Sequence, residues 1–180
     1  MNIDLLRHGM PENGRMYRGN SINDPLSPLG WSQMKDSTRN LSWDFIATSP
    51  MSRCYDFASY LSKKTNTDLK IFENLKEIGL GEWEGKTYDE IGLKNINEFK
   101  NNPLEKKIRY AENLFDFRDR VITTLNEIIS ENIKYRKILI VSHAGVIRII
   151  KSYYSKLPIN EIFKLQVSNG ELVRINILKS

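Results

Sequence analysis

Hydrophobic residues along the chain follow two alternating periods. Short apolar runs typical of strands are separated by longer stretches in which apolar residues recur every three or four positions, as on one face of a helix. The clearest strand covers residues 138–141 (Ile-Leu-Ile-Val), which are apolar on both faces and predict a buried central strand. The clearest helix covers residues 114–131, and its inner face consists of Leu114, Phe117, Val121, Leu125 and Ile128. Strands that alternate with helices predict an α/β sandwich with a mostly parallel sheet.

Two serine-proline pairs mark the predicted starts of further helices. In Ser27-Pro28 and again in Ser49-Pro50, the serine can act as N-cap and the proline can take the first helical position. The first of these helices should carry its inner face on Trp31, Met34, Thr38 and Leu41. The second should carry its inner face on Cys54, Ala58 and Leu61, with Arg53 in its first turn.

The remaining segments complete the predicted order of elements. Further strands are expected at residues 3–6, 45–47 and 69–72. Residues 76–92 are broken by glycines and predict a functional loop with a short helix. The tail alternates over residues 163–167 and 173–177, which predicts a terminal hairpin or paired strands around Asn169-Gly170. Since no repeat, low-complexity tract or linker interrupts this order, we predict one domain over residues 1–180.

Composition narrows the classes of function. The formal charge of the 180 residues is +5, and Cys54 is the only cysteine, so no internal disulfide can form. The sequence contains no signal peptide and no apolar run long enough to span a bilayer, so we expect a cytoplasmic protein with no membrane partner. The lysines are scattered apart from residues 106–109, which favours an anionic metabolite over nucleic acid as the partner. The oligomeric state is left open.

The two histidines of the chain occupy equivalent positions. His8 and His143 each follow an apolar strand and stand just before a glycine or an alanine-glycine pair. In an open α/β sheet the ligand crevice lies outside the carboxyl ends of the strands, so both imidazoles should meet in one pocket. The helix predicted after His143 should add backbone N–H groups that favour an anion. For either histidine alone, a purely structural role would be the simpler interpretation. Their equivalent positions at two strand ends favour a catalytic role for the pair.

Two arginines strengthen the prediction of a phosphate pocket. Arg7 precedes His8, and Arg53 lies where a helix follows a strand end. Guanidinium groups bind phosphate oxygens through paired, charge-assisted hydrogen bonds. Either arginine could instead serve solubility or pair with Asp24 or Asp56. No metal-ligand spacing such as His-x-x-x-His occurs and there is one thiol, so no metal is expected.

A carboxylic acid could supply a proton to the leaving group in such a pocket. Four acids lie close together in the sequence, namely Glu73, Glu77, Glu82 and Glu84. Composition alone does not indicate which of the four acids would be the proton donor.

Five segments, in order, resemble the histidine phosphatase superfamily, which includes the cofactor-dependent phosphoglycerate mutases. Leu6-Arg7-His8-Gly9 resembles its Arg-His-Gly signature, and residues 24–30 resemble the segment that follows. Thr48 to Arg53 resembles its Ser-Pro-x-x-Arg motif, and Leu75 to Gly85 its Leu-x-Glu…Gly-x-Trp-Glu-Gly segment. Residues 141–148 resemble its second histidine motif. This likeness implies a three-layer α/β/α sandwich that needs neither metal nor cofactor.

The resemblance also implies roles for the residues. His8 would be the nucleophile, a neutral imidazole with its other nitrogen bonded to a backbone carbonyl. Arg7, Arg53 and His143 would bind the phosphoryl group, and Glu77 would be the proton donor. The substrate would be a phosphorylated small molecule and inorganic phosphate a product. Met10 stands where many members have glutamate, which changes the pocket rim, and Ala144 stands where many have glycine.

The branch of the family is harder to assign from sequence. Residues 17–20 (Tyr-Arg-Gly-Asn) resemble the α-ribazole phosphatase group, which places Gly19 and Asn20 near the substrate. The leading hypothesis is a hydrolase, with α-ribazole 5′-phosphate as one candidate substrate. The alternatives are a phosphoglycerate-type phosphomutase, a protein phosphohistidine phosphatase that docks through residues 106–109, and a phosphate-binding module without activity. The presence of His8, Arg7, Arg53, Glu77 and His143 together argues against a module without activity.

Overall fold

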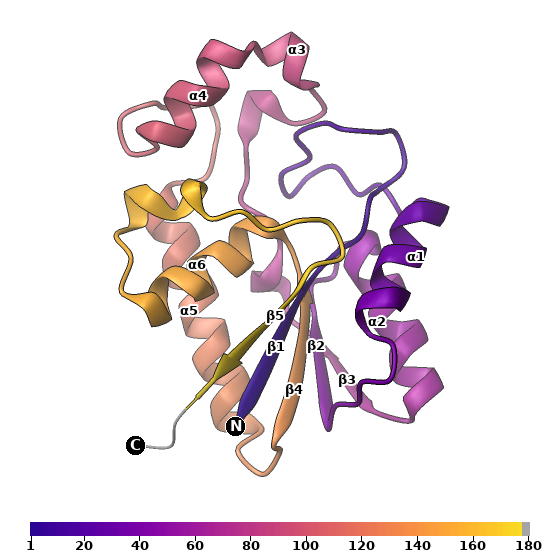
Figure 1. Cartoon of the computed structure of the whole chain (residues 1–180). Helices are drawn as coiled ribbons and strands as arrows, with labels where there is room; N and C mark the ends of the chain where they lie inside the picture. The colour runs from indigo at the N-terminus through magenta and orange to yellow at the C-terminus, as the bar shows by residue number, and fades with distance from the viewer. Residues whose placement is uncertain (178–180) are drawn as a thin grey trace.

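A five-stranded sheet forms the centre of the molecule, in a computed structural model that describes residues 1–177 (Figure 1). The strand order is β3-β2-β4-β1-β5. The strands are β1 (Asn2–Arg7), β2 (Phe45–Thr48), β3 (Asp68–Ile71), β4 (Lys137–Ser142) and β5 (Leu172–Asn176). The first four strands are parallel to one another, and β5 is antiparallel to β1. The prediction of a mostly parallel sheet with β4 buried at its centre is therefore confirmed.

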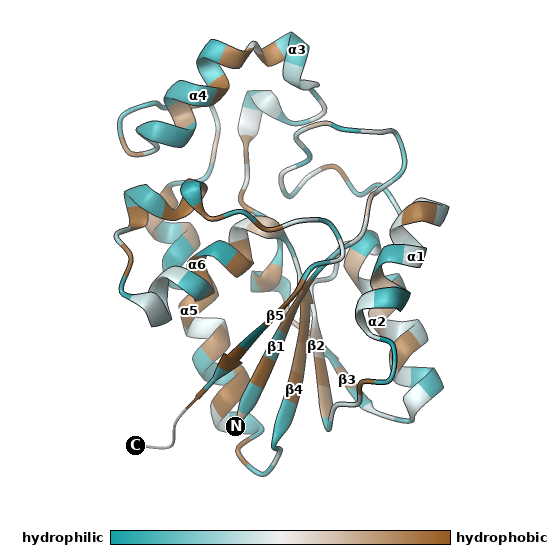
Figure 2. Ribbon diagram, viewed as in Figure 1, coloured by the Kyte–Doolittle hydropathy of each residue, from teal (hydrophilic) through white to brown (hydrophobic). Residues whose placement is uncertain are grey.

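Helices cover both faces of the sheet, which gives the predicted three-layer α/β/α sandwich (Figure 1). One face carries α1 (Pro28–Ser37) and α2 (Ser52–Thr65), and the other carries α5 (Leu114–Glu131) and α6 (Ala144–Ser155). The apolar residues of β4 alternate between the two cores: Ile138 and Ile140 pack toward α5 and α6, while Leu139 and Val141 pack toward α1 and α2. The central strands β2 and β4 are accordingly largely hydrophobic in Figure 2.

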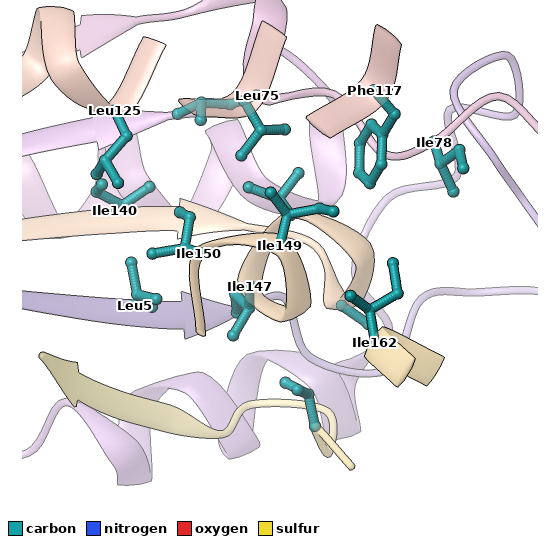
Figure 3. Packing of buried hydrophobic residues seen from close by; sticks show 14 of the residues in the cluster. Leu5, Leu75, Ile78, Phe117, Leu125, Ile140, Ile147, Ile149, Ile150 and Ile162 are labelled. Carbon is teal, nitrogen blue, oxygen red and sulfur yellow. The ribbon is translucent and has the colours of Figure 1, made fainter. Parts of the chain in front are cut away.

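The larger core lies between the sheet and the α5–α6 layer (Figure 3). Leu5 and Ile140 of the strands contact a layer of fully buried side chains that includes Phe117, Leu125 and Ile150. Burying side chains of this size stabilises the fold by roughly 1.5–3 kcal/mol each. This packing makes the strands a rigid support for the residues at their carboxyl ends.

A smaller group of helices lies above the carboxyl ends of the strands (Figure 1). It consists of α3 (Tyr88–Ile91) and α4 (Leu93–Asn101), preceded by the short 3₁₀ helices η1 (Glu73–Leu75) and η2 (Gly81–Trp83). Thr87 and Glu90 form a reciprocal capping box at the start of α3. The predicted short helix within residues 76–92 is thus confirmed. The α4 helix was not predicted.

The two predicted helix starts have different outcomes. Ser27 caps α1 as expected, because its Oγ accepts a hydrogen bond from the Gly30 N–H at 3.1 Å. The prediction for Ser49-Pro50 was wrong, since α2 begins at Ser52 and its N-cap, Met51, makes no side-chain cap. The Ser49 hydroxyl instead lies 2.8 Å from a ring nitrogen of His143. Leu41 was also wrongly placed, because α1 ends at Ser37 and Leu41 is exposed.

The C-terminal tail differs from the predicted hairpin. The alternating pattern of residues 163–167 belongs partly to a 3₁₀ helix, η3 (Ile159–Lys164), whose Ile162 packs into the larger core. The second half of the tail forms β5, which pairs with β1 because that edge of the sheet has no other partner. None of the helices within residues 1–177 has both the length and the apolar character needed to cross a membrane.

Candidate active site

The two histidines meet where β1 and β4 end. Arg7 and Ser142, the last residues of these neighbouring parallel strands, are in register, so His8 and His143 leave the sheet side by side. Their ring centroids are 5.3 Å apart in an edge-to-face arrangement. The prediction that the strand ends bring both imidazoles to one place is confirmed.

The orientation of His8 leaves one ring nitrogen available. Its Nδ1 lies 2.8 Å from the carbonyl oxygen of Gly9. Because a carbonyl oxygen only accepts, Nδ1 carries the proton and Nε2 keeps its lone pair. Burial lowers the pKa of His8 well below its ordinary value, and the charge of Arg7 lowers it further. His8 is therefore a neutral imidazole with a free Nε2, as the sequence led us to expect.

The main chain of His8 is fixed by the segment before β5. The His8 carbonyl accepts hydrogen bonds from the Gly170 N–H and the Asn169 Nδ2, both at 3.2 Å. The His8 N–H donates to the Ser142 carbonyl at 3.0 Å. The Asn169-Gly170 turn, which the sequence placed in a hairpin, thus positions the backbone of His8.

His143 is fully buried beneath His8. Its Nε2 is 2.8 Å from Ser49 Oγ, which also accepts a hydrogen bond from the Met51 N–H at 3.3 Å. The Ser49 hydroxyl can therefore donate its own proton to Nε2, which would leave Nδ1 protonated. The Cys54 sulfur lies 3.6 Å from the same Nε2. Burial, followed by the charge of Arg53, lowers the pKa of His143 well below its ordinary value.

Arg7 and Arg53 are held by backbone carbonyls rather than by carboxylates. Arg7 donates from Nη1 to the Val167 carbonyl at 2.7 Å. Arg53 donates to the carbonyls of Ile22 at 2.7 Å and Gly19 at 3.0 Å. The Nε atoms of both arginines are buried and have no hydrogen-bond partner within residues 1–177. Unsatisfied buried donors of this kind are costly, so these two suit an anion that enters the site.

A cavity of about 710 Å³ lies against these residues. Of the site residues predicted from sequence, His8, Arg7, Arg53, Glu77 and Gly19 line it. His143 and Asn20 are absent from its lining; His143 is fully buried, and Asn20 is exposed to solvent. Met10, predicted at the pocket rim, and Ala144, at the start of α6, both line the cavity.

Only one of the four candidate acids faces this cavity. Glu77 lines it and accepts hydrogen bonds from the Gly145 N–H at 3.1 Å and the Ile78 N–H at 3.0 Å. Its carboxylate thus occupies the N-terminus of α6, a position that favours negative charge. Glu73 pairs with Lys76 on the surface, and Glu82 is exposed. The fourth acid, Glu84, binds backbone N–H groups instead.

Glu84 links the loop after β1 to the segment of residues 73–84, which contains the four candidate acids. Its carboxylate accepts hydrogen bonds from the N–H groups of Asn20 and Ser21, both at 3.2 Å, and of Leu80 at 2.7 Å. Gly19 has a positive φ of 53°, and a Cβ there would overlap the Glu84 side chain. Gly19 is therefore required by the backbone of this loop, and the Asn20 main chain holds the loop in place.

Several residues of the site were missed in the sequence. Tyr17, Tyr88 and Arg148 line the cavity, and Ser49 supports His143. The Ser-Pro-x-x-Arg match contained Ser49, but the helix-capping interpretation hid its role. Tyr17 lies in the segment of residues 17–20 that the resemblance singled out, but no role was predicted for its side chain, and no local pattern marks Tyr88 on α3. Within residues 1–177, no three His, Cys, Asp or Glu side chains gather as a metal-binding group, so metal independence stays a prediction.

Residues 3–180 fit the model of the histidine phosphatase superfamily, branch 1. The chain therefore belongs to the histidine phosphatase superfamily. Members of this superfamily are phosphatases that hydrolyse phosphomonoesters, and this chain is such a phosphatase.

Individual relatives carry different names. A protein of Hydrogenobacter thermophilus provisionally named phosphoserine phosphatase 2 is 27% identical over 181 residues, covering 96% of this chain and 88% of the relative. The adenosylcobalamin/α-ribazole phosphatase of Escherichia coli is 23% identical, covering 94% and 87%. The crystal structure of the α-ribazole phosphatase from Shigella flexneri matches with a TM-score of 0.84 at 24% identity, covering 99% and 92%. The last match supports the fold.

Proposed function

We propose that this phosphatase hydrolyses a small-molecule phosphomonoester through a phosphohistidine on His8. The observation that carries the proposal is the orientation of His8, whose Nδ1 is bonded to the Gly9 carbonyl while Nε2 is free. A neutral imidazole held in this tautomer is a competent nucleophile. It lies in a cavity with the buried, unpartnered Nε donors of Arg7 and Arg53.

In the first step His8 Nε2 attacks phosphorus, and the bond from phosphorus to the ester oxygen breaks. Arg7 and Arg53 would stabilise the charge on the phosphoryl oxygens. His143, whose ring centroid lies 5.3 Å from that of His8 and whose Nε2 contacts Ser49, would support the binding of the same group. Protonated Glu77 would give its proton to the departing alkoxide, so that an alcohol leaves.

In the second step a water molecule attacks the phosphorus of phosphohistidine. Glu77, now a carboxylate, would take a proton from that water as the phosphorus–nitrogen bond breaks. Inorganic phosphate is released, and His8 returns to its neutral form. The proposal is supported by the position of Glu77, which lines the same cavity as His8 and accepts a hydrogen bond from the Gly145 N–H at 3.1 Å.

We propose α-ribazole 5′-phosphate as the first substrate to test. Support comes from residues 17–20, which resemble that group, and from the two relatives with this name. Gly19 lines the cavity, and the exposed Asn20 is retained as a proposed contact that a ligand could reach from the rim. The relative at 27% identity carries a different substrate, phosphoserine, in its name, so the panel should also include phosphoserine.

The proposal is tested with a panel of phosphomonoesters and measurement of released phosphate. We expect turnover by the wild-type protein in the presence of EDTA and none by His8→Ala, with circular dichroism confirming that the variant is folded. Transfer of phosphate to a second acceptor, stimulated by a bisphosphorylated primer, would establish a phosphomutase instead. Activity only on phosphorylated proteins would contradict the assignment of a small-molecule substrate.

A further inference from the structure

The cavity holds more positive charge than one phosphoryl group needs. Its cationic lining comprises Arg7, Arg15, Arg53, Lys100 and Arg148, and its acidic lining comprises Glu77 and Asp89. Arg18 also lines it but is paired with Asp24 at 3.0 Å. The excess is three positive charges, whereas a phosphomonoester carries at most about two negative charges at neutral pH. A substrate with one further negative charge would balance the site.

Arg148 is the cation best placed to bind that charge. It projects from α6, and its Nε donates to the Leu165 carbonyl at 2.8 Å, which fixes the plane of the guanidinium. Its terminal nitrogens make no hydrogen bond and no ion pair within residues 1–177, although the side chain is half-buried. Burial lowers its pKa, and the charge of Glu77 acts against that effect. The guanidinium stays charged and keeps a free face for a carboxylate.

Tyr17 also lines the cavity. Its buried hydroxyl interacts with the side chain of Tyr88 and has no charged partner within residues 1–177. Burial raises the pKa of Tyr17, so the hydroxyl keeps its proton and can donate. The Tyr17 ring is 4.9 Å from that of Tyr88, and Phe163 lies 5.9 Å from the Arg148 guanidinium carbon. These rings supply an apolar wall for the organic part of a substrate.

We propose that Arg148 binds a carboxylate on the organic part of the substrate, and that the preferred substrates are acid-bearing phosphomonoesters. This inference rests on the proposed function, because the phosphoryl group must occupy the His8 end of the cavity. The inference also distinguishes candidate substrates that carry an acidic group from those that do not. The organic part of α-ribazole 5′-phosphate has no acidic group, so that compound would leave Arg148 without a partner.

The test compares pairs of synthetic substrates of equal size. The value of kcat/KM is measured for 3- and 4-carboxyphenyl phosphate and for the corresponding carbamoylphenyl phosphates. The quantity of interest is the ratio of carboxylate to carbamoyl substrate, and its change between variants cancels the difference between the leaving groups. The variants are Arg148→Gln, Arg148→Lys and, as a matched control on the exposed side of α5, Arg118→Gln.

We expect the ratio for at least one pair to fall roughly tenfold or more in Arg148→Gln, the effect of losing a charge-assisted hydrogen bond. Arg148→Lys keeps the charge and should retain part of the preference, while Arg118→Gln should match the wild type. An unchanged ratio for both pairs in Arg148→Gln and Arg148→Lys would overturn the inference. Absence of any turnover by the wild-type protein, p-nitrophenyl phosphate included, would overturn the proposed function itself.

Discussion

Arg120 donates hydrogen bonds to both carboxylate oxygens of Glu112, at 2.6 and 2.9 Å. The same guanidinium donates to the carbonyls of Asn74, Lys76 and Glu77, at 2.6 to 3.0 Å. Glu112 in turn accepts a hydrogen bond from the Gly79 N–H at 3.0 Å. The pair therefore binds the backbone on both sides of Glu77, and it fixes the position from which that carboxyl group reaches the cavity.

Disrupting this pair should impair proton donation more than phosphoryl binding. In Arg120→Gln, Glu77 loses its backbone support, and a misplacement of about 1 Å can cost on the order of a hundredfold in rate. We expect kcat for an alkyl phosphate to fall by roughly 10- to 100-fold, because an alkoxide needs the proton. Phosphoenzyme formation from p-nitrophenyl phosphate should change much less, since p-nitrophenolate leaves unaided.

The matched control for Arg120→Gln is Arg118→Gln, two residues earlier on α5, where the arginine is exposed and pairs with Asp119. It should leave both rates as in the wild type. Equal losses for the alkyl and aryl substrates in Arg120→Gln would show that the pair supports the fold in general and not the acid.

Removing the acid itself should separate the two chemical steps. Glu77→Gln cannot donate or accept the proton, and general acid–base catalysis contributes about 10²- to 10⁴-fold. With p-nitrophenyl phosphate, the variant should release one equivalent of p-nitrophenolate rapidly and then turn over slowly, as measured by stopped-flow absorbance. If the burst slows equally for alkyl and aryl phosphates, Glu77 binds substrate and the acid lies elsewhere.

Arg53 should act mainly by stabilising the transition state of phosphoryl transfer. Its buried Nε has no partner within residues 1–177, and its other nitrogens are occupied by the carbonyls of Ile22 and Gly19. Arg53→Ala should cost roughly 3 kcal/mol, about a hundredfold in kcat/KM, by analogy with the loss of one preorganised donor. Thermal unfolding should be followed in parallel. A variant that stays folded and keeps its full kcat/KM would remove Arg53 from the phosphoryl site.

The strand ends explain why so much of the site could be predicted. His8 and His143 follow parallel strands, so their proximity is a consequence of topology that the sequence pattern already contains. Arg53 and Glu77 were assigned through motifs, and the cavity includes both. In contrast, the Ser49–His143 contact joins residues 94 positions apart, and the Arg120–Glu112 pair binds backbone groups of residues 74–79, more than 30 positions earlier in the chain. No local periodicity records such contacts, because tertiary packing decides them.

The C-terminal tail shows why a sequence pattern alone can predict the wrong secondary structure. Alternation over residues 163–167 satisfies a strand pattern, yet η3 forms because Ile162 packs into the core against the helical layer. Short apolar patterns fit a strand and a helical turn equally well, and packing selects between them.

The buried histidines should make stability depend on pH. Burial lowers the pKa values of His8 and His143 well below the ordinary value of 6.5. Below that value the unfolded chain binds protons that the folded protein does not, so the free energy of unfolding falls as pH falls. Each histidine contributes up to about 1.4 kcal/mol per pH unit in this range, and its effect disappears above the unfolded pKa.

Urea unfolding at about pH 5 and about pH 7.5 measures this dependence, with the pKa of free histidine between them. Carboxylates also contribute to the pH dependence of the unfolding free energy. The comparison of the wild type with His8→Gln therefore isolates the contribution of His8. The variant should lose less stability than the wild type on acidification. Identical pH dependence of the two proteins would mean that His8 titrates normally in the fold.

The central claim is that the phosphoryl group passes through His8 Nε2. Its most direct test is to quench the reaction with radiolabelled substrate within milliseconds and to locate the phosphate on the protein by mass spectrometry. We predict label on His8, labile in acid and stable in base as expected for a phosphoramidate, and its absence in His8→Ala. Phosphate on a serine or aspartate, or turnover without any phosphoenzyme in a Glu77→Gln variant that should accumulate it, would contradict the account.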